Sequence, residues 1–430
     1  MLEGLIGLAI FLTIAFMRVP LAFSMALVGF AGFAYKTNLP AASSMIAQVF
    51  YETGFQYTLS VIPLFVVMGN FIVRARITEE LFDAAYAFFG HLKGGLAIST
   101  LAACAGFGAV CGSSVATSAT FTKVAFSPMI RFSYRGGFAA ATIAAGGTLG
   151  IMIPPSVIMI LYGVMTENNI GKLFAAGIVP GLVALTLMCM TVVLIGWLKP
   201  EECPAGERAA WGARFRALRS VWPAVVLFLV VMGGIYGGVF TANEGAAIGA
   251  VGAVAFALWR GCRTWGDMRD VLVESGRTTV MIFMLLIGAL MFANFINLTT
   301  LPQDLVAFVT HYGVSPTIVM LLIMAIYIVL GVAMEEVSMI LLTLPIFYPL
   351  VVKLGFDPIW FGVVIVSVVM IGMVSPPVGL NLFVVRALLP SIKTSDLLKS
   401  VTPYAIALCV LPLILLLFPQ LATWLPQFVK

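Results

Sequence analysis

The chain has 430 residues, of which 62% are hydrophobic and only 10% are charged. Soluble domains carry roughly 25% charged residues, and a soluble fold of this length could not bury so much apolar surface. The composition therefore excludes a soluble protein and predicts an all-α polytopic membrane protein; the net charge of +5 is spread over loops and indicates no nucleic-acid partner.

Apolar stretches follow one another along almost the whole chain. They cover residues 2–17, 19–34, 57–73, 94–111, 113–130, 137–163, 173–198, 221–240, 243–259, 278–298, 317–334, 337–352, 358–390 and 401–425. A helix crosses a bilayer with about 20 apolar residues, so most of these stretches are long enough to span it. The first stretch lacks a basic start and a small-residue cleavage site, and we interpret it as a retained span.

The order of these stretches predicts five segments. They are N-terminal scaffold spans at 1–56, a first repeat at 57–198 with a hairpin at 94–130, a polar cytoplasmic linker at 199–220, a two-span scaffold hairpin at 221–277, and a second repeat at 278–425 with a hairpin at 317–352.

The repeat is visible around two Pro-Pro pairs. The stretch 150–156 (Gly-Ile-Met-Ile-Pro-Pro-Ser) recurs as 372–378 (Gly-Met-Val-Ser-Pro-Pro-Val). The polar hairpin tip that begins at Gly112 stands as far before Pro154 as the tip that begins at Met334 stands before Pro376. The same offset carries the amphipathic stretch 77–95 onto 299–317. Shared spacing from the amphipathic stretch through the tip to the proline pair indicates an internal repeat.

Lysine and arginine positions predict the orientation. With the N-terminus outside, 19 of the 23 basic residues are cytoplasmic, and four lie outside: Lys36, Lys172, Lys353 and Lys430. The positive-inside rule then places both termini in the periplasm. The chain enters the two hairpins from opposite sides, so the repeats are inverted, which is typical of secondary transporters with a midplane binding site.

Hydroxyl residues gather at the tip of the first hairpin. Six of the ten residues from Ser113 to Thr122 are serine or threonine, and Gly106, Gly108 and Gly112 precede them. Hydroxyls at membrane depth bond to backbone carbonyls, to neighbouring helices or to cations. Helix packing remains the alternative for any single hydroxyl, whereas the cluster with its glycines indicates a binding site.

The two Pro-Pro pairs and the second tip carry further candidates. Proline removes an N–H donor, so each pair is expected to interrupt its span and free carbonyls that a sodium ion can satisfy; a plain kink is the alternative. Glu335 and Glu336 form the second tip. Carboxylates within a membrane are costly and usually functional, although structural acceptors in a wet cavity are the alternative.

Enzyme motifs are absent from the sequence: it contains no HExxH, no GxSxG in a suitable context and no P-loop. We therefore expect no enzymatic activity and no organic cofactor, with transport driven by an ion gradient or a partner. The six cysteines form no CxxC pair and are predicted to pack as small residues, so no metal other than Na⁺ is expected.

Several ordered stretches resemble one family. Residues 108–117, 144–156, 237–249, 371–383 and 418–426 are similar to hallmark stretches of the large (M) subunit of TRAP (tripartite ATP-independent periplasmic) transporters, of the dicarboxylate and sialic acid type. Residues 241–244 read Thr-Ala-Asn-Glu where the family usually has Thr-Pro-Thr-Glu, and Glu336 is also unusual.

The resemblance implies an elevator-type transporter with two re-entrant hairpins and two amphipathic arm helices in the bacterial inner membrane. A periplasmic substrate-binding (P) protein would deliver an organic acid, a small membrane (Q) subunit would extend the scaffold, and Na⁺ would be the coupling ion. A stand-alone Na⁺/divalent-anion symporter of the same architecture, or a channel, is the alternative.

The resemblance also places the candidate sites. The residues assigned to Na⁺ lie at the tips and breaks: Gly112, Ser113, Ser114, Thr117, Gly147, Thr148, Pro154, Glu335, Ser338, Ser375, Pro376, Gly379 and Asn381. The residues assigned to substrate are Ser113, Ser114, Pro155, Ser156, Glu336 and Pro377.

Overall fold

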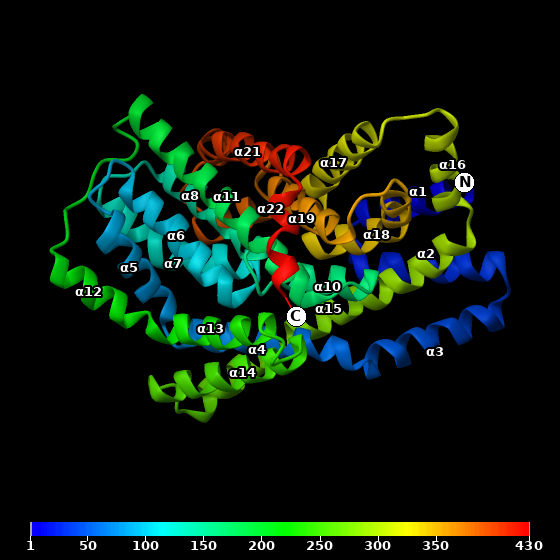
Figure 1. The fold of residues 1–430 in the computed structure, drawn as a ribbon, viewed down its shortest axis with the longest axis horizontal. Helices are drawn as coiled ribbons and strands as arrows, with labels where there is room; N and C mark the ends of the chain where they lie inside the picture. Colours follow the sequence, from blue (N-terminus) through cyan, green and yellow to red (C-terminus); the bar gives the residue numbers. More distant parts are fainter. Residues whose placement is uncertain (1, 430) are drawn as a thin grey trace.

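A computed structural model describes residues 2–429 (Figure 1), so Lys430 of the orientation count lies outside the described residues. Residues 2–429 form helices and connections, with no strand among them, which confirms the all-α prediction. Seven helices in this part of the chain are long and apolar enough to cross a membrane, and the bent pair α12 (Trp211–Ser220) and α13 (Trp222–Tyr236) would make an eighth.

Helix bounds extend the repeat over the whole chain. Both bounds of α18 (Glu336–Lys353) match those of α7 (Ser114–Arg131) at the offset that relates the two Pro-Pro pairs. Nearly the same offset relates α1 (Leu2–Phe16) to α13, and α2 (Leu21–Lys36) to α14 (Ala242–Trp259). The N-terminal spans and the central scaffold hairpin are therefore also copies of one another, which the sequence pattern did not reveal.

The apolar stretches of the sequence predict no helix between residues 34 and 57. The structure has α3 (Leu39–Phe55) there, followed by a short 3₁₀ turn at Tyr57–Ser60 and by α4 (Val61–Arg74). Their counterpart in the second repeat is a single helix of 34 residues, α15 (Trp265–Leu298). The first scaffold helix is thus broken where the second is continuous.

The break is held by a side chain from the neighbouring scaffold hairpin. Asn243, near the start of α14, donates from Nδ2 to the carbonyl of Tyr57 at 2.6 Å and to the hydroxyl of Ser60 at 2.9 Å. Backbone groups freed by a helix break in an apolar setting need such partners.

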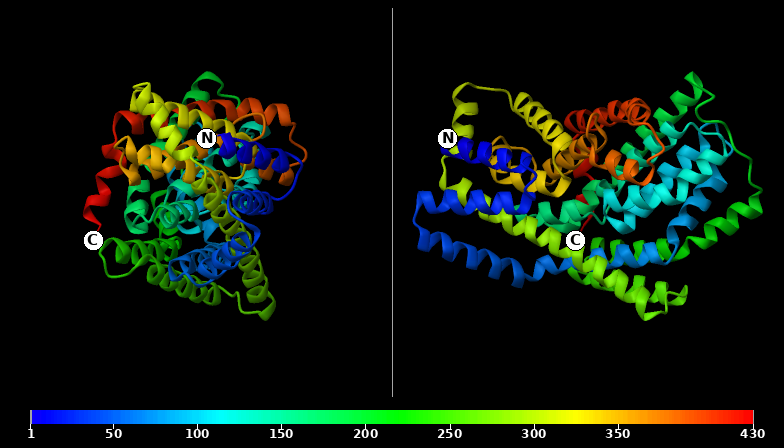
Figure 2. Two further views of the ribbon diagram at one scale, coloured as in Figure 1. Left: turned by 90° about the vertical axis from the view of Figure 1, so that its right-hand side faces the viewer. Right: turned by 180° about the vertical axis from the view of Figure 1, so that it is seen from behind.

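The arms and hairpins occupy the predicted places. Arm helices α5 (Ile77–Phe89) and α16 (Leu301–His311) lie near opposite ends of the longest axis (Figures 1 and 2). The first hairpin pairs α6 (Gly95–Cys111) with α7, and the second pairs α17 (Pro316–Ala333) with α18. Two residues join the helices in each hairpin.

Both predicted interruptions are present. The first leaves α8 (Gly136–Gly147) and the short α9 (Leu149–Met152) before the Pro154-Pro155 pair and α10 (Val157–Thr166) after it. The second separates α19 (Pro358–Val374) from α20 (Leu380–Leu388). The remaining elements are α11 (Ile170–Leu198), α21 (Thr394–Leu417), α22 (Gln420–Thr423) and a final 3₁₀ turn (Leu425–Phe428).

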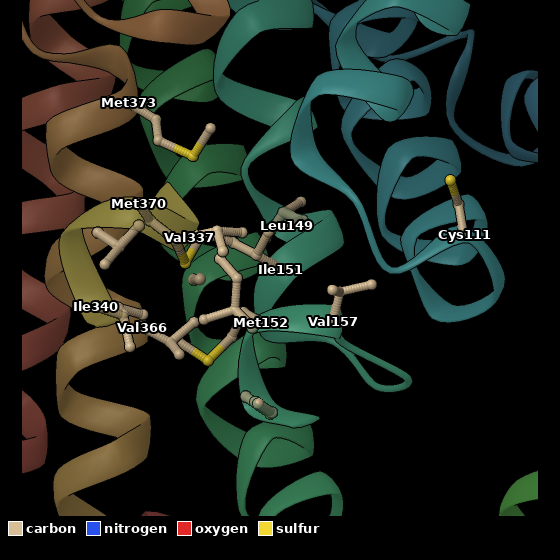
Figure 3. Packing of buried hydrophobic residues seen from close by; sticks show 14 of the residues in the cluster. Cys111, Leu149, Ile151, Met152, Val157, Val337, Ile340, Val366, Met370 and Met373 are labelled. Atoms are coloured by element: carbon tan, nitrogen blue, oxygen red, sulfur yellow. The ribbon is translucent and has the colours of Figure 1, made fainter. Parts of the chain in front are cut away.

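Glycine pairs let each hairpin touch the broken helix of its own repeat. A Cβ on Gly108 would lie 2.7 Å from the Cα of Gly150, and a Cβ on Gly372 would lie 2.7 Å from the Cα of Gly331. The repeats also interlock: Figure 3 shows Met152 of the first break packed near Ile340 and Val366 of the second repeat. The hairpins and breaks therefore form one packed body.

Candidate functional site

A cavity of 830 Å³ lies where both hairpin tips face the scaffold. The first tip contributes Gly112 and Ser113, and the second contributes Glu335, Glu336 and Ser338. The opposite wall comes from three scaffold helices, α2, α4 and α15: Pro20, Leu21, Ala22, Phe23, Val66, Gly69, Asn70, Glu274, Thr278, Met281, Ile282, Met284 and Leu285. Five of the predicted site residues thus share one cavity.

The charged groups of this cavity are all acidic. Glu274, Glu335 and Glu336 line it, and among the described lining residues there is no lysine, arginine or histidine. Most of the other lining residues are apolar, and among the neutral polar ones Asn70 donates to the hydroxyl of Ser275 at 2.9 Å between two scaffold helices.

The first tip sits directly on the first helix break. Gly112 adopts the left-handed conformation, with φ of 67°, and a Cβ there would lie 2.5 Å from the carbonyl oxygen of Pro155. The amide of Val157 donates to the carbonyl of Gly112 at 3.4 Å, and Ser113 caps α7 by accepting from the amide of Ala116. Only glycine fits this turn without strain.

A side-chain contact joins the two repeats at the first tip. Asn381, just after the second break, donates from Nδ2 to the hydroxyl of Ser114 at 2.7 Å and to the carbonyl of Ala144 at 3.1 Å. The Ser114 hydroxyl lies 2.9 Å from the amide oxygen of Asn381. Both side chains are fully buried. Residues predicted separately in the two repeats thus belong to one polar cluster.

Ser118 belongs to the same region but was absent from the predicted site residues. Its side chain is fully buried and its Oγ has no hydrogen-bond partner among the described residues. A Cβ on Gly147 would lie 1.9 Å from that Oγ, so Gly147 leaves room for the hydroxyl. Ser118 lies one helical turn after Ser114, so the two residues lie on the same face of α7. The run of serines and threonines in the first tip was the signal that could have identified Ser118.

Other predicted hydroxyls bond to nearby backbone carbonyls. Thr117 donates to Ser113, Thr148 to Ala145, Ser156 to Ile151 and Ser375 to Ile371, at 2.6–2.7 Å. These bonds stabilise helix ends and breaks.

In the second tip, one carboxylate is hydrogen-bonded, and the other has one oxygen without a hydrogen-bond partner in the described part of the chain. The hydroxyl of Ser338 donates to Oε2 of Glu335 at 2.9 Å. Glu336 is only 7% exposed, and its Oε2 is buried without a partner among the described residues. Glu336 begins α18 as Ser114 begins α7, so the two residues occupy matching positions of the repeats.

The two Pro-Pro breaks differ in their surroundings. Pro154 and Pro155 are buried, whereas Pro376 and Pro377 are exposed. Four of the residues assigned to substrate, Ser114, Pro155, Ser156 and Pro377, are not among the residues that line the cavity. Gly379, with φ of 45°, packs against the carbonyl of Met373 at the end of the second break.

Glu274 and Thr278 are cavity residues that the sequence reading did not single out. Both lie in the first half of α15. Thr278 is the first residue of the apolar stretch 278–298, and Glu274 precedes that stretch. Only the tertiary fold brings this half of α15 opposite the hairpin tips.

Two inverted helical repeats whose hairpin tips face one cavity define a membrane transporter. The sequence profile described as "Tripartite ATP-independent periplasmic transporter, DctM component" matches residues 8–421, and the chain belongs to this family. The match confirms the resemblance of the sequence to TRAP large subunits and shows that the chain is a transporter permease.

Individual relatives agree with the family. The C4-dicarboxylate TRAP transporter large permease protein of Pseudomonas aeruginosa is 35% identical over 90% of this chain and 91% of its own length. The ectoine TRAP transporter large permease protein of Halomonas elongata is 32% identical over 86% of each chain. The crystal structure of the Alcanivorax borkumensis YdaH transporter shares the fold, with a TM-score of 0.63 and 14% identity over 90% of this chain and 88% of that one.

Proposed function

We propose that this chain mediates Na⁺-coupled uptake of an organic acid that a periplasmic substrate-binding protein delivers. The observation that carries this proposal is the single cavity shared by both hairpin tips and the scaffold. A site between two packed bodies can become accessible from one side of the membrane and then from the other when one body moves against the other.

The first tip offers a suitable place for Na⁺. Hard cations take oxygen ligands, and Ser114, Ser118 and Asn381 bring three side-chain oxygens to one buried region beside Gly147. The unpartnered hydroxyl of Ser118 supports this assignment, because a buried polar atom without a partner is costly. At the second tip, Glu335 and Ser338 are the corresponding candidates.

The proposed mechanism is an elevator in which the hairpins and broken helices slide along the scaffold. Pro20–Phe23, next to the α1–α2 connection, line the cavity. Toward α13, Val110 and Pro155 line a contact with Met68 and Leu227 that has no room for a water molecule. With the N-terminus outside, the α1–α2 connection is cytoplasmic, so we assign this arrangement to an inward-facing state.

The word "tripartite" in the family description supports two further components, which we propose are a small membrane subunit and a periplasmic binding protein. We place the chain in the bacterial inner membrane with both termini in the periplasm, following the distribution of its lysines and arginines.

Uptake into proteoliposomes tests this proposal. The vesicles would contain the chain and its small subunit, with an imposed inward Na⁺ gradient and labelled organic acids, with or without the binding protein. We expect uptake that requires both Na⁺ and the binding protein. Uptake without the binding protein would instead support a stand-alone symporter, and conductance without saturation would support a channel.

A further inference from the structure

The two hairpin tips meet at one cavity but differ in charge. The first tip, Gly112–Ser114, is uncharged and presents the N-terminal end of the 18-residue helix α7. The second tip carries Glu335 and Glu336 at the start of α18. A helix N-terminus with free N–H groups favours an anionic group, whereas carboxylates favour a cationic one.

Glu335 and Glu336 have different roles within the second tip. Glu335 accepts a hydrogen bond from the Ser338 hydroxyl within its own helix turn and so helps to hold the tip. Glu336 lines the cavity, is more than nine-tenths buried, and has an Oε2 that no described residue contacts by a hydrogen bond. A carboxyl removed from water in this way is neutral when protonated, and it is ionised only when a positive partner compensates for the lost hydration.

The internal repeat explains why Oε2 of Glu336 has no hydrogen-bond partner among residues 2–429. Its counterpart Ser114 bonds to Asn381 on α20. The residue that matches Asn381 in the first repeat is Met159, on α10, and α10 packs against α18 as α20 packs against α7. A methionine offers no donor where the other repeat offers an amide. The scaffold supplies no base either, since Glu274 is the only charged scaffold residue among the described lining residues.

We propose that the substrate of this chain is a zwitterion, with a carboxylate or sulfonate held at the first tip and an ammonium or amidinium group bound by Glu336. This proposal rests on the proposed transport function and narrows its substrate class. A dianion would place a second negative charge beside Glu335 and Glu336, and like charges at short range in a poorly hydrated site are unfavourable.

Matched probes can test the preference for a positive group. Succinate and β-alanine, and glutarate and γ-aminobutyrate, are pairs in which an ammonium replaces one carboxylate, and ectoine adds an amidinium. The full chain in lipid nanodiscs containing NaCl would be titrated with each probe, with the shift in unfolding temperature as the readout. We expect at least one zwitterion to stabilise the wild type more strongly than its matched dianion or, for ectoine, than both dianions.

Variants assign the preference to Glu336. E336S copies the residue at the matching position of the first tip and should weaken the apparent Kd for the zwitterion by about 10-fold or more, the usual effect of losing a charge-assisted hydrogen bond. The conservative E336D should retain part of the preference. E201S removes an exposed acid outside the cavity and should match the wild type.

The proposal is overturned if no zwitterion is preferred over the dianions, or if E336S keeps the wild-type preference. Neither result bears on Na⁺ coupling or on dependence on the binding protein, which the uptake experiment measures separately. Conversely, uptake that needs neither Na⁺ nor the binding protein would contradict the transport proposal while leaving a Glu336-dependent zwitterion preference intact.

Discussion

Asn381 shows how a single side chain can join two repeats that are far apart in sequence. Its amide bonds to Ser114 and to the carbonyl of Ala144, so it links the second helix break to the first hairpin tip and to α8. Proximity to a Pro-Pro pair made Asn381 a candidate from sequence. Its partners could not be predicted, because they depend on how the two repeats pack against each other.

If the first tip is the Na⁺ site that we propose, replacing Asn381 should weaken Na⁺ binding there. Asn381→Leu removes an amide oxygen and leaves the Ser114 hydroxyl without its partner, which we expect to raise the Na⁺ concentration for half-maximal uptake by about 10-fold. Na⁺ titration of uptake in proteoliposomes measures this value. Asn297→Leu, at an exposed position of α15, is the matched control. An unchanged Na⁺ dependence would remove Asn381 from the proposed ion site.

Gly112 gives a second prediction at this scale. Gly112→Ala places a side chain in the left-handed region and 2.5 Å from the Pro155 carbonyl. The conformational cost alone is about 1–2 kcal/mol, and the contact adds to it. We expect a lower unfolding temperature and a large loss of uptake. Gly276→Ala meets no atom within 4 Å and should lose neither. Full activity of the Gly112 variant would show that the tip tolerates a different turn.

At the scale of elements, the sequence predicted the parts that are marked by local chemistry. Glycines and hydroxyls marked the first tip, paired acids the second, and paired prolines both helix breaks. Helix α3 was missed because Ser43, Ser44, Gln48 and Glu52 interrupt its apolar pattern. The participation of Glu274 and Thr278 in the cavity was also missed, because a residue at the start of a span gives no local sign of what it faces.

The broken scaffold helix between α3 and α4 leads to a third prediction. Asn243→Ala removes both bonds that hold the Tyr57–Ser60 turn, each worth about 0.5–1.5 kcal/mol. Hydrogen exchange should therefore become faster at residues 56–61 and stay unchanged in the continuous helix α15. Unchanged exchange at residues 56–61 would show that the turn is stabilised by its own backbone geometry.

At the scale of the whole molecule, the inverted repeat explains why two hairpin tips line one cavity, because each repeat contributes one hairpin. The matched helices α1 with α13, α2 with α14, and α7 with α18 extend the pseudo-symmetry from end to end. The present arrangement is asymmetric, since residues beside the α1–α2 connection line the cavity, whereas the first hairpin packs against α13 with no room for a water molecule. In the proposed elevator, exchange of the two repeats' conformations would invert this asymmetry and so bring the cavity to the other side of the membrane.

Accessibility of the cavity tests the direction of this asymmetry. Thr278→Cys, in a background without the native cysteines, should react with a membrane-impermeant thiol reagent added to the cytoplasmic side when substrate is absent. Its counterpart in the first repeat, Gln56→Cys, should react only from the periplasmic side, as the orientation of the repeats requires. Labelling of Thr278→Cys from the periplasm alone would reverse the assigned orientation.

The most direct test of sliding is to lock the closed contact. Val110 on the hairpin and Leu227 on the scaffold line the same closed space, so cysteines at both positions can be joined by a short bifunctional methanethiosulfonate reagent. We predict that crosslinking abolishes uptake, that reduction restores it, and that either single cysteine variant is unaffected by the reagent. Full uptake by the crosslinked protein would contradict an elevator in which the hairpins move along the scaffold.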